Sequence, residues 1–266
     1  MAAGKFSGMS RLSWFWVALV TAYVVALFQL SDVVFAFVPG GHYNSATRVV
    51  LGLTLGVVMW KFLPRAWGRV VVRPSKDRLL VVGVIGSLYL APVYGGNELG
   101  KLSMLVLLGY VLGVSLVGIA EEFLSRGVVF ALCEGRSISW AVAVSSITFG
   151  AMHFMNLQGG DDLDTVVVQV FGASAIGVML AGLMIFSRSI WVPIIFHALY
   201  NLPFAQFDSV NTGHSAIPIS YLIWLVSSAL LQIATGVLLI YFADREPVAI
   251  KRWLVKFKLI EEVRHG

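Results

Sequence analysis

Polar residues suited to one kind of chemistry stand in three short and otherwise apolar segments of the chain. A carboxylate and an imidazole that hold a water molecule between them can act as a general base. A second imidazole and a carboxamide can donate hydrogen bonds to the oxyanion of a tetrahedral intermediate. Together, such groups would hydrolyse an amide bond without a covalent intermediate. The residues in question are Glu121, Glu122 and Arg126, then His153, then His197 and Asn201.

Helical spacing assigns different roles to these side chains. Glu122 and Arg126 are i, i+4 neighbours, so the guanidinium can neutralise this carboxylate in a structural pair. Glu121 is turned about 100° away from Glu122 and is free to face a cavity. His197 and Asn201 are again i, i+4 neighbours, so both can donate to one ligand atom. A lone histidine in a membrane helix is often a packing residue, so the prediction for His153 depends on its occurrence with the others.

The same residues allow a second chemistry, which is metal binding. Glu121, His153 and His197 could form the two-histidine, one-glutamate set of a catalytic zinc site with an open position for water. The chain lacks the H-E-x-x-H helix of zinc-dependent proteases. Its one cysteine, Cys133, excludes a cysteine-rich metal site and an intramolecular disulfide. The residues alone leave the zinc-dependent and the metal-free mechanism open.

The elements that position these residues are predicted to be membrane helices. The chain has 266 residues, of which 58% are hydrophobic and 12% charged, and its mean hydropathy is +0.86. Because a soluble domain carries about 25% charged residues, this composition excludes a soluble enzyme, a disordered chain and a nucleic-acid-binding module. We predict an all-α, polytopic single membrane domain (1–266) with a polar catalytic cavity inside the bundle. About eight spans are expected, near 14–38, 47–63, 79–94, 105–132, 138–156, 165–187, 190–206 and 218–242.

The basic residues predict how these spans are oriented. If the N-terminus is cytoplasmic and all eight stretches cross, 17 of the 19 Lys and Arg residues fall on the cytoplasmic side, and only Arg48 and Lys101 fall outside. The positive-inside rule predicts this asymmetry, so both termini are expected in the cytoplasm. The loop 61–78 and a basic amphipathic tail (243–266) are expected to contact anionic lipid. A chain rich in Val and Gly, with short loops, favours a bacterial plasma membrane.

The rise of a helix gives the depth of each polar residue below the cytoplasmic ends of the spans. These depths place the polar side chains near one layer in the middle of the membrane. That convergence requires the fourth span to continue past the two glutamates to about Leu132. The depths are about 16 Å for Glu121, 22 Å for His153, 10 Å for His197 and 16 Å for Asn201.

Three motifs in succession resemble those of the CPBP intramembrane proteases, a family that includes the CAAX prenyl proteases and Abi-type bacteriocin-processing proteins. The E-E-x-x-x-R signature is similar to residues 121–126. The F-x-x-x-H signature is similar to residues 149–153, and the H-x-x-x-N signature to residues 197–201. The three occur in family order, and the resemblance covers roughly residues 105–205.

The resemblance implies a role for each matching residue. Glu121 would be the catalytic glutamate, and His153 would share the activation of water. His197 and Asn201 would form the oxyanion hole. The resemblance favours a metal-free endopeptidase that cleaves a peptide or membrane-protein substrate, with zinc as the alternative. Supporting positions would be Glu122, Arg126 and Phe149.

Two functions of other classes compete with a peptidase. The basic loop 61–78 and the tail could be docking surfaces of a non-catalytic membrane scaffold, or of a bacteriocin-immunity protein that binds a peptide or protein partner. A proton-coupled transporter that uses Glu121 and His153 is disfavoured, because the sequence shows no corresponding pair of broken helices. The sequence predicts no nucleic-acid partner and leaves the substrate and the oligomeric state open.

Overall fold

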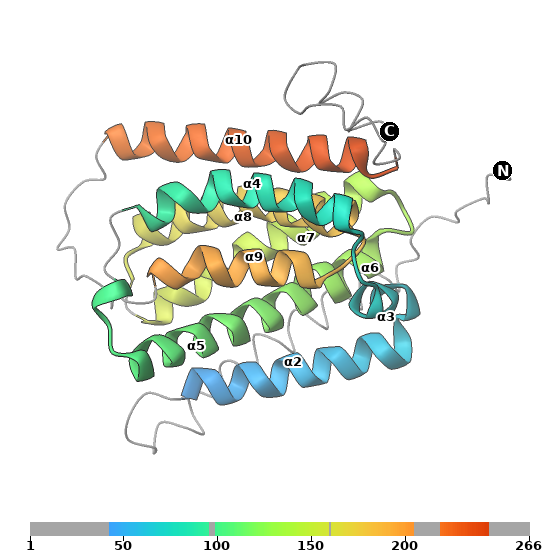
Figure 1. Ribbon diagram of the computed structural model, residues 1–266, viewed down its shortest axis with the longest axis horizontal. Helices are drawn as coiled ribbons and strands as arrows, with labels where there is room; N and C mark the ends of the chain where they lie inside the picture. The colour runs from blue at the N-terminus through green and yellow to red at the C-terminus, as the bar shows by residue number, and fades with distance from the viewer. Residues whose placement is uncertain (1–42, 96–98, 160, 205–218, 245–266) are drawn as a thin grey trace, which may run out of the picture.

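A computed structural model describes residues 43–95, 99–159, 161–204 and 219–244, and these residues form helices and their connections (Figure 1). The predicted all-α fold is therefore confirmed. The predicted span 14–38 and residues 245–266 of the predicted tail lie outside the described residues. The elements are α2 (Tyr43–Phe62), α3 (Pro64–Val71), α4 (Lys76–Tyr94), η1 (Leu99–Lys101), α5 (Met104–Glu122), η2 (Phe123–Val129), α6 (Phe130–Cys133), α7 (Ile138–Ala151), η3 (Met152–Gly159), α8 (Leu163–Ser187), α9 (Trp191–Asn201), η4 (Leu202–Phe204) and α10 (Ile219–Ala243).

Within the described residues, five helical segments are long and apolar enough to cross a membrane, which identifies a multi-pass membrane protein. One of them, Met104–Cys133, joins α5, the π-helical segment η2 and α6 over 30 residues. It continues past both glutamates, as the predicted convergence requires. A sixth candidate is the pair α2 and α3, which is bent by 116°. The described part of the predicted stretch 190–206 forms the 11-residue α9 and the three-residue η4. Together they are shorter than the roughly 20 residues of a span, so the count of about eight stays a prediction.

The early end of α9 has a chemical cause. Pro203 has no backbone N–H with which to bond the carbonyl of Leu199 four residues earlier. The Tyr94 hydroxyl donates to that carbonyl instead, at 2.9 Å. This bond joins the end of α4 to the end of α9, next to Asn201.

Polar side chains define where several helices begin. Ser75, Ser103, Ser137 and Asp162 each accept a hydrogen bond from the backbone N–H three residues later, at the starts of α4, α5, α7 and α8. At Asp162, the backbone N–H and the hydroxyl of Thr165 hold the pKa of the carboxyl below its ordinary value. The ionised carboxylate suits the positive end of the α8 dipole.

Successive long helices run in alternating directions, so that α3, the α6–α7 turn and the α8–α9 turn lie at one end of the bundle (Figure 1). The backbone N–H of Ile190 bonds the carbonyl of Arg69 at 3.1 Å, and the side chain of Arg69 pairs with Glu134. The described basic residues of the 61–78 segment therefore gather at this end, opposite the end that carries Lys101 and the start of α8. The assignment of this end to the cytoplasm remains a prediction.

Two arginines of the segment 61–78 make contacts between elements of the bundle. The Arg78 side chain is buried and donates to the carbonyl of Phe186 and, at 3.1 Å, to that of Ala243. It thereby joins the last turns of α8 and α10, and its positive charge suits these helix C-termini. Arg69 is held by Glu134 in a similar way. Lipid contact stays a prediction for the exposed basic residues of the segment, which are Lys61, Arg65, Arg73 and Lys76.

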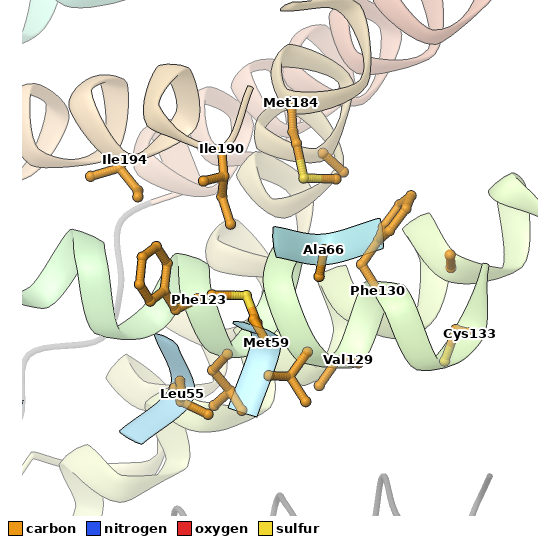
Figure 2. Packing of buried hydrophobic residues seen from close by; sticks show 14 of the residues in the cluster. Leu55, Met59, Ala66, Phe123, Val129, Phe130, Cys133, Met184, Ile190 and Ile194 are labelled. Carbon is orange, nitrogen blue, oxygen red and sulfur yellow. The ribbon is translucent and has the colours of Figure 1, made fainter. Parts of the chain in front are cut away.

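The core forms where the long helices cross. The central helix α8 packs against α4, α7, α9 and α10. Side chains of α2, α3, η2, α6, α8 and α9 meet in one apolar cluster (Figure 2), in which Met59, Phe130 and Met184 are fully buried. Large apolar side chains cover the outer faces, for example Leu105 at 81% and Leu230 at 63% exposure. Such faces are suited to lipid rather than to water.

Glycines allow the backbones to approach closely at these crossings. A Cβ on Gly182 would lie 2.6 Å from the carbonyl oxygen of Gly236, and a Cβ on Gly177 would lie 3.0 Å from Ser146 Cα. The distance at Gly182 is shorter than real Cβ contacts, and the distance at Gly177 is tighter than nearly all of them. The tight packing of α8 against α7 and α10 that small residues favour in membranes therefore depends on these positions.

We expect Gly182→Val to destabilise the bundle, because the added side chain would force α8 away from the α10 backbone. Overpacking of this kind costs about 1–3 kcal/mol. Thermal unfolding in detergent, followed by intrinsic fluorescence, measures the effect. The matched control is Gly109→Val on α5, because a Cβ at Gly109 meets nothing within 4 Å. Equal melting temperatures for the two variants would contradict the prediction.

Candidate active site

The imidazole of His197 lies between the two neighbouring glutamates. Its Nδ1 is 3.1 Å from Glu122 Oε1, and its Nε2 is 3.8 Å from Glu121 Oε2. An ionised carboxylate can only accept hydrogen bonds, so Nδ1 of His197 carries the proton that is donated to Glu122. This bond fixes the ring so that Nε2 is the nitrogen directed at Glu121.

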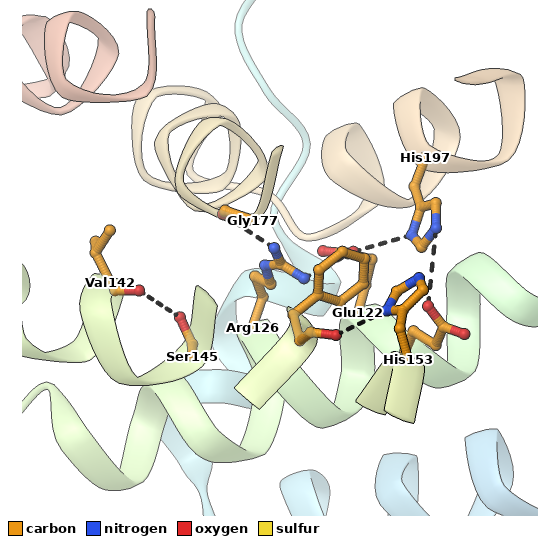
Figure 3. A network of polar contacts seen from close by, with 9 residues as sticks. Glu122, Arg126, Val142, Ser145, His153, Gly177 and His197 are labelled. Atoms are coloured by element: carbon orange, nitrogen blue, oxygen red, sulfur yellow. Dashed lines mark hydrogen bonds and ion pairs between the residues drawn. The ribbon is translucent and has the colours of Figure 1, made fainter. Parts of the chain in front are cut away.

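Glu122 is held in place by a fully buried ion pair. Arg126 donates from Nη1 to Glu122 Oε1 at 3.0 Å and from Nη2 to the carbonyl of Gly177 at 2.9 Å (Figure 3). Both charged side chains are 0% exposed. The i, i+4 pair predicted from the sequence is confirmed, and the structure adds that Glu122 also binds His197. The pair thus links α5 and η2 to α8 and to α9.

Glu121 differs from its neighbour in accessibility. Its side chain is 24% exposed, against 0% for Glu122. The difference follows from the 100° turn between successive helical residues, which directs Glu122 into the bundle and Glu121 to a more open position. Glu121 is therefore the more accessible carboxylate of the two, in line with its predicted role.

The buried ring of Phe149 contacts three of the predicted site residues. The guanidinium of Arg126 lies over the ring at 4.4 Å from its centroid. The imidazoles of His153 and His197 pack edge-on against it, at centroid distances of 5.7 and 5.4 Å. Phe149 also places its carbonyl oxygen 3.2 Å from His153 Nδ1. The two imidazoles come from η3 and α9 and point toward the same space (Figure 3).

His153 belongs to a different kind of helix from the one predicted. The predicted α-helix over 138–156 ends at Ala151, and His153 lies in the 3-10 segment η3 that continues it. Among the described contacts, His153 has no hydrogen bond to Glu121. Its predicted share in activating water therefore stays a prediction.

A cavity of about 450 Å³ lies beside these residues, between η3, α8, α9 and α10. Its walls include His153, His197 and Asn201. His197 and Asn201 thus face a common space, as their i, i+4 spacing predicts. Glu121 is not one of the described residues that line the cavity, and its contact with the site is through His197.

The described residues contain no group of three or more His, Cys, Asp and Glu side chains arranged to hold a metal ion. In the part of the chain that the structure describes, Glu121 contacts His197, whereas His153 Nδ1 faces a backbone carbonyl. Because the hydrogen bond of each histidine engages its Nδ1, the zinc-dependent and the metal-free mechanism both stay predictions.

Several cavity residues were not singled out from the sequence as site residues. Asn156 donates to Gln169 Oε1 at 2.8 Å, and Gln232 of α10 contributes a further carboxamide to the walls. Tyr200 and Gly172 also line the cavity. The signal that could have found Gln232 is a lone glutamine within a 25-residue apolar helix.

Residues 103–203 match the family model described as type II CAAX prenyl endopeptidase, Rce1-like. The predicted resemblance to the CAAX proteases is therefore confirmed over this segment, which contains all four predicted catalytic residues. Comparison with curated proteins and with solved structures gave no match. The match supports a CAAX-type intramembrane protease.

Proposed function

We propose, on the premise of this family match, that the chain is an intramembrane endopeptidase that hydrolyses a peptide bond of a peptide or membrane-protein substrate. The observation that carries the proposal is the position of His197, which lies between the partly exposed Glu121 and the buried Glu122 and lines a cavity together with Asn201. Carboxylate, imidazole and carboxamide in one place are the groups that metal-free amide hydrolysis needs.

In the proposed reaction, the Glu121 carboxylate takes a proton from a water molecule. The water oxygen forms a bond to the carbonyl carbon of the substrate, and the carbonyl oxygen becomes an oxyanion. His153, which lines the same cavity as His197, is proposed to orient the attacking water. When the tetrahedral intermediate collapses, the C–N bond breaks and the proton passes from Glu121 to the leaving amine nitrogen.

The oxyanion is proposed to bind His197 and Asn201. Asn201 can donate from its carboxamide nitrogen. Because Nδ1 of His197 donates to Glu122, His197 can donate to the oxyanion only from Nε2, with a proton on each nitrogen. Each donor of this kind is worth about 3–4 kcal/mol of the barrier. Glu122 and Arg126 act here as positioning residues that hold the ring of His197.

The proposal includes a location in the membrane. The exposed basic residues around α3 favour this end of the bundle as the cytoplasmic end of a multi-pass plasma-membrane protein. The same residues would then face anionic lipid headgroups.

The test combines membranes and purified protein. Membranes of cells that express the wild-type chain or Glu121→Gln are compared for peptides that accumulate only with the variant, and those peptides are then offered to the purified chain in detergent. We expect cleavage by the wild type, with and without the chelator 1,10-phenanthroline. Cleavage that is equally fast after Glu121→Gln would overturn the proposal. Stoichiometric zinc whose removal abolishes cleavage reversibly would replace the metal-free mechanism by the zinc one.

A further inference from the structure

The helix α10 forms a whole wall of the cavity but lies outside residues 103–203, which match the family model. It contributes a stripe of residues at spacings of three and four, as one face of a helix does. This face changes in character along the helix, from aromatic and apolar side chains to polar ones. The stripe consists of Tyr221, Trp224, Leu225, Ser228 and Gln232.

Gln232 is the most unusual member of this stripe. It is 5% exposed and lies inside an apolar 25-residue helix, where a carboxamide needs hydrogen-bond partners. Its side chain bonds the hydroxyl of Tyr200, three residues beyond His197 on α9. A carboxamide has two N–H donors and one acceptor oxygen, so one bond to Tyr200 leaves bonding capacity for a ligand.

Three further carboxamides line the same cavity, from three other elements. Asn156 of η3 and Gln169 of α8 are hydrogen-bonded to each other at 2.8 Å, and Asn201 lies at the end of α9. Because a carboxamide both donates and accepts, it can pair with the N–H and C=O groups of an extended peptide whatever its side chains are. Carboxamides on four sides of one cavity are therefore suited to a peptide backbone.

The cavity is also suited to uncharged side chains. Among the described residues that line it, none is Lys, Arg, Asp or Glu. A charged substrate side chain would lose its hydration there without finding a free counter-charge, because the doubly protonated His197 of the proposed mechanism is already paired with Glu122. Trp224, Leu225 and Ile176 offer apolar contact instead. The volume of about 450 Å³ lies within the range of about 300–1,000 Å³ that is typical of ligand pockets.

We infer that this cavity binds an extended, uncharged segment of the substrate next to the scissile bond, and that α10 selects that segment through Gln232 and Ser228. The inference rests on the proposed peptidase function and extends it to the class of substrate. Gln232 binds the substrate backbone, and the aromatic end of the stripe receives an apolar side chain.

The test uses a library of ten-residue peptides in which Ala, Leu, Gln, Lys or Glu occupies one position at a time on either side of the cleaved bond. One arm of the library carries a farnesylated cysteine and the other does not. For the purified wild type in detergent, we expect Lys and Glu near the cleaved bond to lower kcat/KM at least about tenfold. Gln232→Leu should raise KM about 3- to 10-fold, as the loss of one hydrogen bond predicts, with kcat little changed.

A changed preference for charged peptides would distinguish substrate recognition by Gln232 and Ser228 from a purely structural role of these residues. Gln232→Glu and, independently, Ser228→Asp should improve cleavage of the Lys peptides about tenfold relative to the Leu peptides. The matched control is Ser227→Asp, which adds the same charge to an exposed residue of α10 outside the cavity wall and should leave the preference unchanged. The melting temperature of each variant is measured in parallel.

The outcomes distinguish this inference from the proposed function. If the wild type cleaves no peptide of either arm in a Glu121-dependent manner, the proposed function fails. If it cleaves them but folded Gln232→Glu and Ser228→Asp keep the wild-type preference, only the assignment to α10 is overturned. Equal cleavage of charged and uncharged peptides by the wild type would overturn the substrate class.

Discussion

Glu121→Gln should lower kcat about 10²- to 10⁴-fold, the contribution typical of a general base, while the melting temperature stays close to that of the wild type. The amide has nearly the same size as the carboxylate but cannot take a proton from water. Glu121 is partly exposed, and its contact with His197 Nε2, at 3.8 Å, is longer than a hydrogen bond. The stability of the fold should therefore change little, whereas kcat should fall because the general base is absent. Steady-state cleavage and thermal unfolding of the same preparations measure the two effects.

The neighbouring residue provides the matched control. Glu122→Gln makes the same chemical change one position along the chain, at a carboxylate that accepts bonds from both Arg126 and His197. We expect this variant to lower the melting temperature as well as kcat, because it leaves the buried guanidinium without its counter-charge. A wild-type kcat in Glu121→Gln, or the same pattern of losses in both variants, would contradict the assignment of the base.

The second large effect is expected on stability. Arg126→Met should destabilise the protein by about 3–5 kcal/mol, because it leaves the Glu122 carboxylate buried without its ion-pair partner. The substitution also removes the bond to the Gly177 carbonyl and the contact with the Phe149 ring. For a chain of this size, the melting temperature should fall by on the order of 10 °C.

A control arginine shows whether the effect comes from the buried pair. Arg136 is exposed, and its guanidinium lies over the Trp140 ring at 4.4 Å. Arg136→Met removes the same charge at the surface, where a change of no more than about 0.5 kcal/mol is expected. The double variant Arg126→Met with Glu122→Leu should recover part of the lost stability, since it removes the uncompensated charge. Equal melting temperatures for Arg126→Met and Arg136→Met would contradict a structural role of the pair.

Sequence alone predicted the parts of this protein that depend on local patterns. Apolar stretches of about 20 residues identify membrane helices because the bilayer requires that length. The long segment through Glu121 and Glu122 and the i, i+4 pair with Arg126 follow from helical geometry, and both are confirmed. The resemblance of the three motifs, which the match over residues 103–203 confirms, directed attention to Glu121, His153, His197 and Asn201.

Local patterns were less successful in predicting the environment of Arg78 and the length of the helix in 190–206. The count of basic residues assigned Arg78 to a lipid-facing loop, but the structure buries it against the ends of α8 and α10. The apolar stretch 190–206 is shorter as a helix than as a sequence pattern, because Pro203 ends the regular bonding of α9. Arg78 is thus fixed by carbonyls far away in the chain, whereas α9 is ended by a proline that lies within the predicted stretch itself.

The sequence by itself thus determined the chemical groups, their order and their positions on individual helices, because these depend on residue type and on the 3.6-residue turn. Only the tertiary structure decided that His197 lies between the two glutamates, that Phe149 contacts both imidazoles, and that Gln232 of α10 shares their cavity. These relations are fixed by how α5, α7, α8, α9 and α10 pack. That packing depends on close approaches such as Gly182 to Gly236, which no single helix encodes.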